Sequence, residues 1–153
     1  MLFLLFHLGP DCYALEAGQV AEVVPFLSIK QIPLAAAGVA GILNYRGDIV
    51  PVIDLSALTL GRPAAVRLST RIILVNYPDS HGGTRLLGLI AEKVTETVRL
   101  ERSDFADPGI ANRAAPYLGP VAATARGMIQ WIEAAKLLPG SVRELLFQEL
   151  SQR

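Results

Sequence analysis

Short apolar runs separated by turn residues dominate the chain, and they predict a protein built mainly of β-strands. The runs have the length and the Val, Ile, Leu and aromatic content of strands, and Gly, Pro, Asp or Arg-Gly steps stand between them. Short strands with frequent turns favour an all-β barrel or sandwich over a parallel α/β sheet. The expected strands are 2–8, 12–15, 20–26, 41–45, 48–53, 71–77, 85–91, 94–100, 121–124 and 128–132.

The strongest helix signal stands at the C-terminal end, where residues 139–153 are expected to form a short α-helix. Ser141 and Glu144 have the spacing of a capping box, in which two side chains satisfy backbone N–H groups at a helix N-terminus. Apolar residues then repeat at helical spacing, so one face of this helix would pack on the protein. These residues are Val142, Leu145, Leu146 and Leu150.

A weak internal repeat indicates two related β units in tandem. In the first half, Arg46-Gly47 precedes a strand that ends at Asp54, and in the second half Arg126-Gly127 precedes a strand that ends at Glu133. Each carboxylate is expected to cap the helical turn that follows it. The division between the units is placed near 78–84, a polar loop between two expected strands.

Composition limits the range of partners. Of the 153 residues, 52% are hydrophobic and 18% are charged, which excludes a disordered chain and indicates apolar surface reserved for other proteins. The 14 basic and 14 acidic residues cancel, so no net field would attract nucleic acid or an anionic membrane. We therefore expect no nucleic acid among the partners.

The apolar start of the chain is expected to be a buried strand. Its run of six apolar residues ends at His7, and Gly9-Pro10 follows closely, whereas a signal sequence or a membrane span needs a longer run. Cys12 is the single cysteine, which excludes an internal disulfide and fits a reducing compartment. A cytoplasmic protein without direct membrane insertion is expected.

The residues that carry most enzyme chemistry are scarce. The chain has two histidines, His7 inside an apolar strand and His81 in a polar loop, and neither is a sequence neighbour of Cys12. No Cys pair, His-x-x-x-His spacing or phosphate-binding glycine loop occurs. We therefore expect no catalytic residues, no metal site and no cofactor, and a protein that is not an enzyme.

Two charged positions stand in apolar surroundings. Arg46-Gly47 joins two very apolar strands, which is typical of an exposed hairpin tip whose glycine takes a positive φ. Glu22 lies inside an apolar strand, and alternation places Val20, Glu22 and Val24 on one face. That face is either a solvated interaction surface or a strand edge whose charge opposes aggregation.

Residues 41–55 read GILNYRGDIVPVIDL and closely resemble the signature of CheW-like domains, the coupling proteins of bacterial chemosensory arrays. The resemblance covers roughly residues 2–138 and is most specific in this central segment. Weaker similarities to the family occur at 6–9, 13–15, 20–23, 70–75, 88–94 and 131–138. The residues of these motifs with expected structural roles are Pro51, Asp54, Gly88 and Glu133.

The resemblance implies both a fold and a function. The fold would be all-β, with two five-stranded SH3-like barrels packed on a shared hydrophobic core within 1–138, and an N-terminal strand that could pair with the second barrel. Members of the family are non-catalytic adaptors, which bridge the cytoplasmic tip of a methyl-accepting chemoreceptor and the regulatory domain of a CheA-type histidine kinase. The chain is accordingly expected in the cytoplasm, associated with membrane-bound receptor arrays.

The resemblance also implies a receptor-binding groove between the barrels. We expect Glu22 and Arg46 to form an ion pair there, with Val20 and Ile49 supplying apolar contact. An exposed pair would contribute only about 0–1 kcal/mol to stability, so its use would be to shape the binding surface. The candidate groove residues are Val20, Glu22, Gly41, Asn44, Arg46, Gly47 and Ile49.

Three other functions stay open from the sequence. An enzyme of unrecognised type would require a polar cluster in a concave pocket, for example around His7 or Cys12. A regulatory sensor domain would hold a small molecule in the groove, which native mass spectrometry would detect. A structural array member would pair with its own kind and would not contact the kinase.

Overall fold

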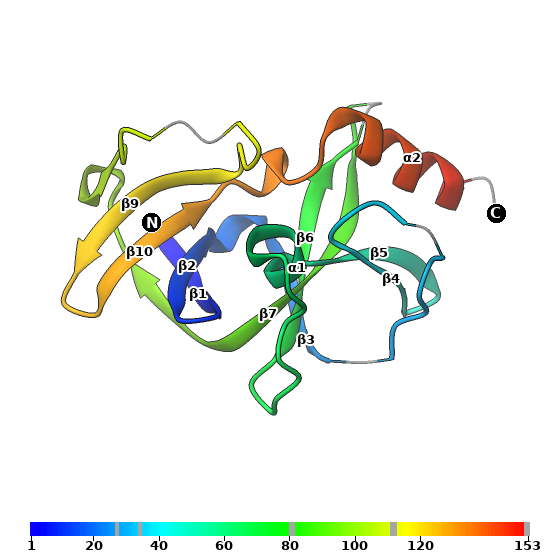
Figure 1. The fold of residues 1–153 in the computed structure, drawn as a ribbon, viewed down its shortest axis with the longest axis horizontal. Helices are drawn as coiled ribbons and strands as arrows, with labels where there is room; N and C mark the ends of the chain where they lie inside the picture. Colours follow the sequence, from blue (N-terminus) through cyan, green and yellow to red (C-terminus); the bar gives the residue numbers. More distant parts are fainter. Residues whose placement is uncertain (27, 34, 80–81, 111–112, 152–153) are drawn as a thin grey trace.

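The computed structural model describes residues 1–26, 28–33, 35–79, 82–110 and 113–151, so the expected loop position of His81 lies outside the described residues. Strands joined into one ten-stranded sheet make up most of the fold (Figure 1). The strands are β1 (Leu2–Leu8), β2 (Asp11–Glu16), β3 (Val20–Pro25), β4 (Val39–Tyr45), β5 (Asp48–Asp54), β6 (Arg71–Pro78), β7 (Thr84–Arg99), β8 (Phe105–Ala106), β9 (Leu118–Thr124) and β10 (Gly127–Ile132). The helices are α1 (Leu55–Leu60) and α2 (Gly140–Ser151), and the 3₁₀ turns are η1 (Ala17–Gln19), η2 (Arg102–Asp104) and η3 (Ala134–Lys136).

The sheet forms two five-stranded barrels. The signature barrel contains β3, β4, β5, β6 and the first half of β7, with the neighbours in the order β3-β6-β7-β5-β4. The terminal barrel contains the second half of β7 with β1, β2, β10 and β9, and the short β8 extends it beside β9. The all-β fold with two SH3-like barrels that the sequence predicted is confirmed.

Strand β7 belongs to both barrels and joins them (Figure 1). Its first half, up to Ala91, pairs with β6 and β5, and its second half, from Glu92, pairs with β1. The two strands predicted at 85–91 and 94–100 are therefore one strand of 16 residues. The apolar pattern breaks at Glu92 because the strand leaves one core there and enters the next.

The passage between the barrels lies inside β7. Lys93 takes a φ of 49°, a left-handed conformation that is rare for a residue with a Cβ, next to the point where the partners of the strand change. The turn at 78–84, where the sequence placed the division, joins β6 to β7 within the signature barrel. Because β1 pairs with β2 and β7, the N-terminal strand lies in the barrel that also holds the last strands of the chain.

The two barrels share one connectivity, which accounts for the internal repeat. Strand β5 of the hairpin β4–β5 runs parallel to β7, and strand β10 of the hairpin β9–β10 runs parallel to β2. The remaining strands also correspond. In the signature barrel β3 pairs antiparallel with β6, and in the terminal barrel the second half of β7 pairs antiparallel with β1. The turns Arg46-Gly47 and Arg126-Gly127 therefore occupy equivalent places.

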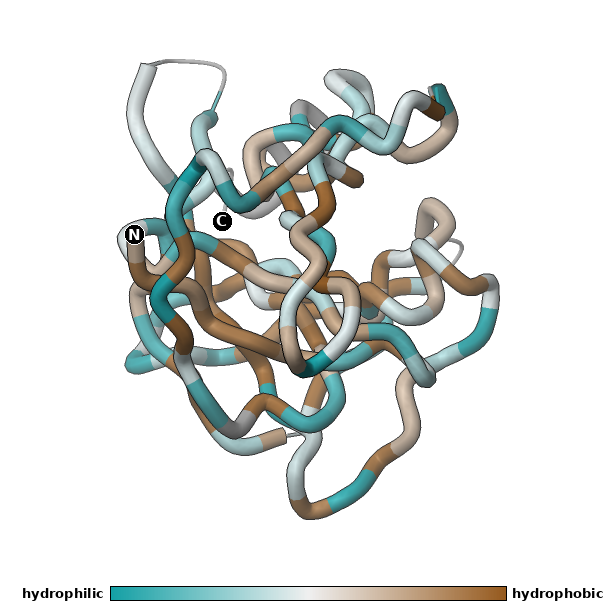
Figure 2. The backbone as a smooth tube through the Cα atoms, turned by 90° about the vertical axis from the view of Figure 1, so that its left-hand side faces the viewer, coloured by the Kyte–Doolittle hydropathy of each residue, from teal (hydrophilic) through white to brown (hydrophobic). Residues whose placement is uncertain are grey.

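Three apolar clusters stabilise this arrangement. One fills the signature barrel around Ile72, and another fills the terminal barrel around Phe3. The largest takes side chains from both barrels and from α2, which contributes Leu146 and Phe147. This is the shared core that the sequence predicted, and Figure 2 shows apolar stretches running through the middle of the molecule.

Asp54 caps α1, as the sequence predicted. Its Oδ1 accepts hydrogen bonds from Ser56 N at 3.0 Å and Ala57 N at 3.2 Å, and its Oδ2 accepts one from Ala64 N at 3.0 Å. The residue is buried, so it satisfies backbone donors that water would not reach. It thereby fixes α1 to the loop that follows the helix.

The other predicted caps fare differently. Glu133 stands at the N-cap position of η3, but its side chain makes no capping hydrogen bond and pairs with Lys136 at 3.2 Å, so this prediction was wrong. A single 3₁₀ turn leaves few free N–H groups to cap. Ser141 lies in the first turn of α2, which begins at Gly140. Leu146 lies in the core and Val142 packs against it, as the pattern predicted, and the side chains of Glu144, Leu145 and Leu150 are not among those that the structure describes.

Gly41 marks a close approach between two backbone segments. It takes a φ of 151°, and Ile42 beside it exchanges hydrogen bonds of 2.8 and 2.9 Å with the backbone of Lys30. A Cβ at position 41 would lie 2.1 Å from the Lys30 carbonyl oxygen. A side chain therefore does not fit there, which explains the glycine.

Replacement of Asp54 by alanine should lower the free energy of unfolding by about 2–4 kcal/mol, because buried N–H donors lose their acceptor. Asp54→Asn keeps only one acceptor oxygen, so its loss should be about half as large. Urea unfolding followed by circular dichroism measures both variants. An Asp54→Ala protein as stable as the wild type would contradict the capping role.

Replacement of Gly41 by alanine should destabilise the fold more than the same change at Gly127. Both glycines have positive φ, but a Cβ at position 127 meets no atom within 4 Å. We expect losses of about 3 kcal/mol at position 41 and about 1 kcal/mol at position 127. Thermal unfolding measures them, and equal losses would show that φ alone decides.

Candidate docking site

The tip of the β4–β5 hairpin is a two-residue turn. Arg46 (φ 52°) and Gly47 (φ 88°) both take positive φ, the type I′ geometry that matches the twist of the flanking strands. Asn44 Oδ1 accepts a hydrogen bond from Gly47 N at 3.0 Å and closes the turn. The predicted exposed tip is confirmed, and the Arg46 side chain is 75% exposed.

Glu22 on β3 is the partner of this tip. Its Oε1 lies 3.6 Å from Arg46 Nη2, so the predicted ion pair is confirmed. Its Oε2 accepts a hydrogen bond from the Tyr45 hydroxyl. The Arg46 guanidinium lies over the Tyr45 ring, with Cζ 5.0 Å from the ring centroid. Glu22, Tyr45 and Arg46 thus form one polar cluster, which we call the tip triad.

Tyr45 is the member of the tip triad that the sequence pattern did not reveal. Its ring packs, partly buried, against the core cluster of the signature barrel, which fixes it beneath Arg46. Its hydroxyl then ties Glu22 on β3 to the hairpin. The signal that could have found it is its place directly before Arg46-Gly47, where it forms the last cross-strand pair of the hairpin, with Asp48.

Asn44 and Ile49 lie on the other face of the hairpin from Tyr45. They are cross-strand partners, as are Tyr45 and Asp48, and successive pairs alternate between the two faces. Ile49 is exposed and borders a groove of about 440 Å³ between the hairpin and the start of β7, where Arg85 also lines it. Of the predicted receptor residues, those on the β4–β5 hairpin therefore lie at its tip and on its faces and do not share one face.

The predicted face of β3 is not a solvated surface. A bulge between Val20 and Glu22 shifts the pairing with β6, but burial still alternates along the strand, and Val20, Glu22 and Val24 share the inward face. Val24 is buried in the core of the signature barrel, and Val20 packs against the core between the barrels. Strand β3 instead exposes Val23, at 38%. The interpretation of this face as an interaction surface was therefore wrong for the two valines. Glu22 lies on the same inward face but at its edge, so its carboxylate is partly exposed.

Three residues of the family-like motifs act through the backbone or the core. Gly41 is buried beneath the segment that holds Lys30, so it contributes no surface of its own. Pro51 is buried on β5 just before this strand begins to pair with β7. A Cβ at Gly88 would lie 3.1–3.2 Å from side chains of the signature core, so glycine leaves that core its room. These positions therefore shape the backbone and core that hold the hairpin, and they do not form its exposed surface.

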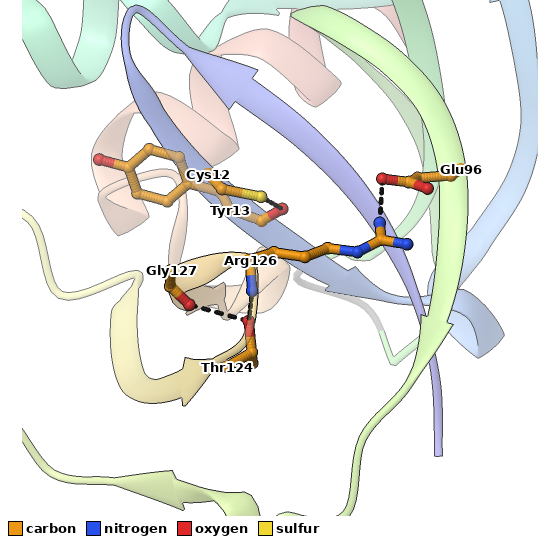
Figure 3. Close-up of polar contacts among 6 residues, drawn as sticks. All are labelled: Cys12, Tyr13, Glu96, Thr124, Arg126 and Gly127. Carbon is orange, nitrogen blue, oxygen red and sulfur yellow. Dashed lines mark hydrogen bonds and ion pairs between the residues drawn. The ribbon is translucent and has the colours of Figure 1, made fainter.

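A second Arg–Glu pair occupies the equivalent place in the terminal barrel (Figure 3). Arg126, at the tip of the β9–β10 hairpin, forms a hydrogen-bonded ion pair with Glu96 on β7, which raises the pKa of the guanidinium. Thr124 Oγ1 accepts a hydrogen bond from Arg126 N at 3.1 Å and donates one to Gly127 O at 2.8 Å. The internal repeat in the sequence indicated this arginine. Its partner Glu96 could not be identified in the same way, because Glu96 lies on β7, the strand that both barrels share.

His7 and Cys12 are the residues around which an enzyme site would have to be built. They are cross-strand neighbours, yet the Cys12 thiol donates to the carbonyl of Tyr13, and His7 Nδ1 has no hydrogen-bond partner among the described residues. Burial raises the pKa of the Cys12 thiol, which disfavours the thiolate that a nucleophile requires. Within the described chain, no three His, Cys, Asp or Glu side chains come together as metal ligands would.

The described helices are also too short or too polar for a bilayer: none reaches the length and apolarity of a membrane-spanning segment.

Comparison with known proteins finds relatives across most of the chain. The CheW-like domain family matches residues 2–141. Two proteins named chemotaxis protein CheW are 26% identical over 138 residues (Klebsiella aerogenes) and 28% identical over 141 residues (Rhizobium meliloti). These alignments cover 89% and 91% of this chain and 80% and 88% of those proteins. A chemotaxis protein CheW of Treponema pallidum is 28% identical over 107 residues, and that alignment spans 60% of its length.

A solved structure has the same fold. The crystal structure of the scaffolding protein TtCheW from Thermoanaerobacter tengcongensis aligns with a TM-score of 0.74 and 30% identity, covering 86% of this chain and 82% of that one. The signature at 41–55, the two barrels and the family match over residues 2–141 agree with one another. The chain is therefore a member of the CheW-like domain family.

Proposed function

We propose that the chain is a non-catalytic adaptor of a bacterial chemosensory array, coupling the cytoplasmic tip of a methyl-accepting chemoreceptor to the regulatory domain of a CheA-type histidine kinase. The observation that carries the proposal is the tip triad, an exposed charged cluster on the hairpin that bears the family signature. The relatives support it, since their names describe chemotaxis proteins and a scaffolding protein. The chain acts by presenting surfaces, in the cytoplasm at membrane-bound receptor arrays.

The receptor tip binds at the rim of the signature barrel in this proposal. Glu22 and Arg46 are held at fixed positions and offer both signs of charge, so a receptor segment with the opposite pattern docks in one orientation. Ile49 and the groove of about 440 Å³ beside it supply apolar contact. An exposed ion pair adds only about 0–1 kcal/mol to folding stability, so the fold does not depend on it and recognition can use it.

The kinase domain binds elsewhere, at exposed ends of the barrels. The two barrels are held in one fixed relation by β7, so a receptor on one surface and a kinase on another are held at a constant distance. A change in the receptor tip then reaches the kinase domain through a rigid connection. This is how an adaptor without a reacting group transmits a signal.

Arg46→Ala should weaken binding to a purified receptor-tip fragment by about tenfold or more, while the melting temperature changes by less than about 2 °C. The side chain is 75% exposed, so its loss opens no cavity. Isothermal titration calorimetry and thermal unfolding measure the two quantities. A large melting shift with unchanged receptor affinity would count against the receptor role.

Two conservative variants sharpen this test. Arg46→Lys keeps the charge but loses the planar contact with the Tyr45 ring, and its affinity should fall between those of the wild type and Arg46→Ala. Tyr45→Phe removes only the hydroxyl that holds Glu22, so it should lower affinity by a few-fold. Tyr13→Phe, in the terminal barrel, is the matched control and should bind as the wild type does.

Coupling itself requires both partners. In a reconstituted mixture of receptor, kinase and this chain, the wild type should make kinase autophosphorylation respond to receptor ligand. Arg46→Ala should reduce that response while a pull-down with the isolated regulatory domain stays unchanged, since the tip triad serves the receptor. A chain that binds the receptor and fails to retain the kinase domain would be a structural array member instead.

A further inference from the structure

The groove of about 440 Å³ beside the β4–β5 hairpin opens where β5 and β7 separate. These parallel strands pair at residues 52–54 of β5 and 88–90 of β7, and no earlier pair joins them in the described chain. Pro51, just before the first pair, has no backbone N–H, so it cannot donate to β7 and extend the ladder toward the hairpin tip. Residues 47–51 and 84–86 therefore form two separate walls, and we call the space between them the hairpin groove.

The two walls of the hairpin groove carry opposite charges. Arg85 lies on the β7 wall and Asp48 on the β5 wall, and they are the charged residues among the described lining. Neither side chain forms an ion pair with another residue in the part of the chain that the structure describes. Both charges are therefore left to pair with whatever enters the groove.

Arg85 is held in place by α2. Its guanidinium Cζ lies 5.4 Å from the centroid of the Phe147 ring, which is a cation–π contact. The ring itself is only 5% exposed and packs in the shared core, 5.8 Å from the ring of Tyr77, the cross-strand partner of Arg85. Arg85 thus lies, half-buried, between α2 and the groove, where Figure 1 shows α2 beside the end of the β6–β7 hairpin.

We propose that Arg85 binds a carboxylate of the receptor tip in the hairpin groove, and that Phe147 of α2 positions the guanidinium for this contact. The inference rests on the proposed receptor function and adds to it a charged contact outside the tip triad. A guanidinium that stacks on a ring by its face keeps its edge N–H groups for a carboxylate, which can accept two parallel hydrogen bonds.

Asp48 makes the hairpin groove selective. On the wall opposite Arg85 it repels a second carboxylate and attracts a basic side chain. The occupant is therefore a receptor segment that carries an acidic and a basic side chain at a fixed separation, and the two charges set its register. Because Arg85 is half-buried and unpaired, its guanidinium has already lost part of its hydration, so the contact with a carboxylate is less screened than one at the exposed tip.

Titration calorimetry with a purified receptor-tip fragment tests the carboxylate contact. Arg85→Ala should lower affinity by about tenfold and Arg85→Glu by about a hundredfold. Arg99→Glu makes the same charge change at an exposed position of the terminal barrel, so it is the matched control and should bind within about twofold of the wild type. Circular dichroism checks that each variant is folded. Wild-type affinity in both Arg85 variants overturns the proposal.

A charge exchange identifies the partner group. Each acidic residue of the receptor fragment is replaced in turn by lysine, and every fragment is titrated against the wild type and Arg85→Glu. One fragment should bind Arg85→Glu more tightly than it binds the wild type, whereas the others should still prefer the wild type. If no fragment regains affinity for Arg85→Glu, the carboxylate contact is wrong.

A double-mutant cycle tests the positioning role of Phe147. Phe147→Leu keeps an apolar side chain in the core but removes the ring, so affinity should fall by about threefold to tenfold. In this background Arg85→Ala should cause a much smaller further loss, because the two residues act through one contact. Leu146→Val, in the same buried stretch of α2, is the control for lost stability and should keep the wild-type affinity. Independent losses for Phe147→Leu and Arg85→Ala would show that α2 does not position Arg85.

Failure of this inference differs from failure of the proposed function. If Arg46→Ala weakens receptor binding while the Arg85 variants bind as the wild type does, the tip triad alone reads the receptor, and the inference is overturned while the receptor function stands. If the wild type binds no receptor fragment, the proposed function fails, and the role of Arg85 fails with it.

Discussion

The fold depends on one strand that serves two barrels. Because β7 carries the hydrogen-bond ladder of the signature barrel in its first half and of the terminal barrel in its second half, the barrels have no hinge between them. The largest apolar cluster fills the space between them and includes the end of the chain through α2. A surface on one barrel therefore keeps its distance and orientation to a surface on the other, which an adaptor requires.

The two barrels use one device at equivalent places. Each has an Arg-Gly hairpin tip whose arginine pairs with a glutamate. The glutamate lies on β3 in the signature barrel and on the second half of β7, the equivalent strand, in the terminal barrel. The surroundings differ: Tyr45 supports the pair in the signature barrel, whereas Arg126 pairs with Glu96 beside the groove that Cys12 lines. The shared connectivity of the two barrels accounts for the likeness, and their different neighbouring side chains account for the difference.

Local pattern was sufficient for most strands, for the Asp54 cap and for the Arg46 turn, because alternation, turn residues and capping act over a few residues. The local pattern failed at positions whose structure depends on residues that are distant in the sequence but adjacent in the fold. The continuity of β7 through Lys93 depends on its pairing with β1, and which face of β3 turns inward depends on the core that packs against it, where Val24 is buried. Glu22 and Arg46 were paired through the family resemblance, while Tyr45 and Glu96 required the folded positions of β3 and β7.

The two barrels also differ in how the chain contributes to them. The signature barrel is made from one continuous stretch, β3 through the first half of β7, whereas the terminal barrel joins β1 and β2 to strands near the other end of the sequence. During synthesis on the ribosome, the signature barrel emerges whole while β1 and β2 wait for β9 and β10. The apolar N-terminal hairpin is then the part of the nascent chain with the longest exposure, and so the part with most need of a chaperone.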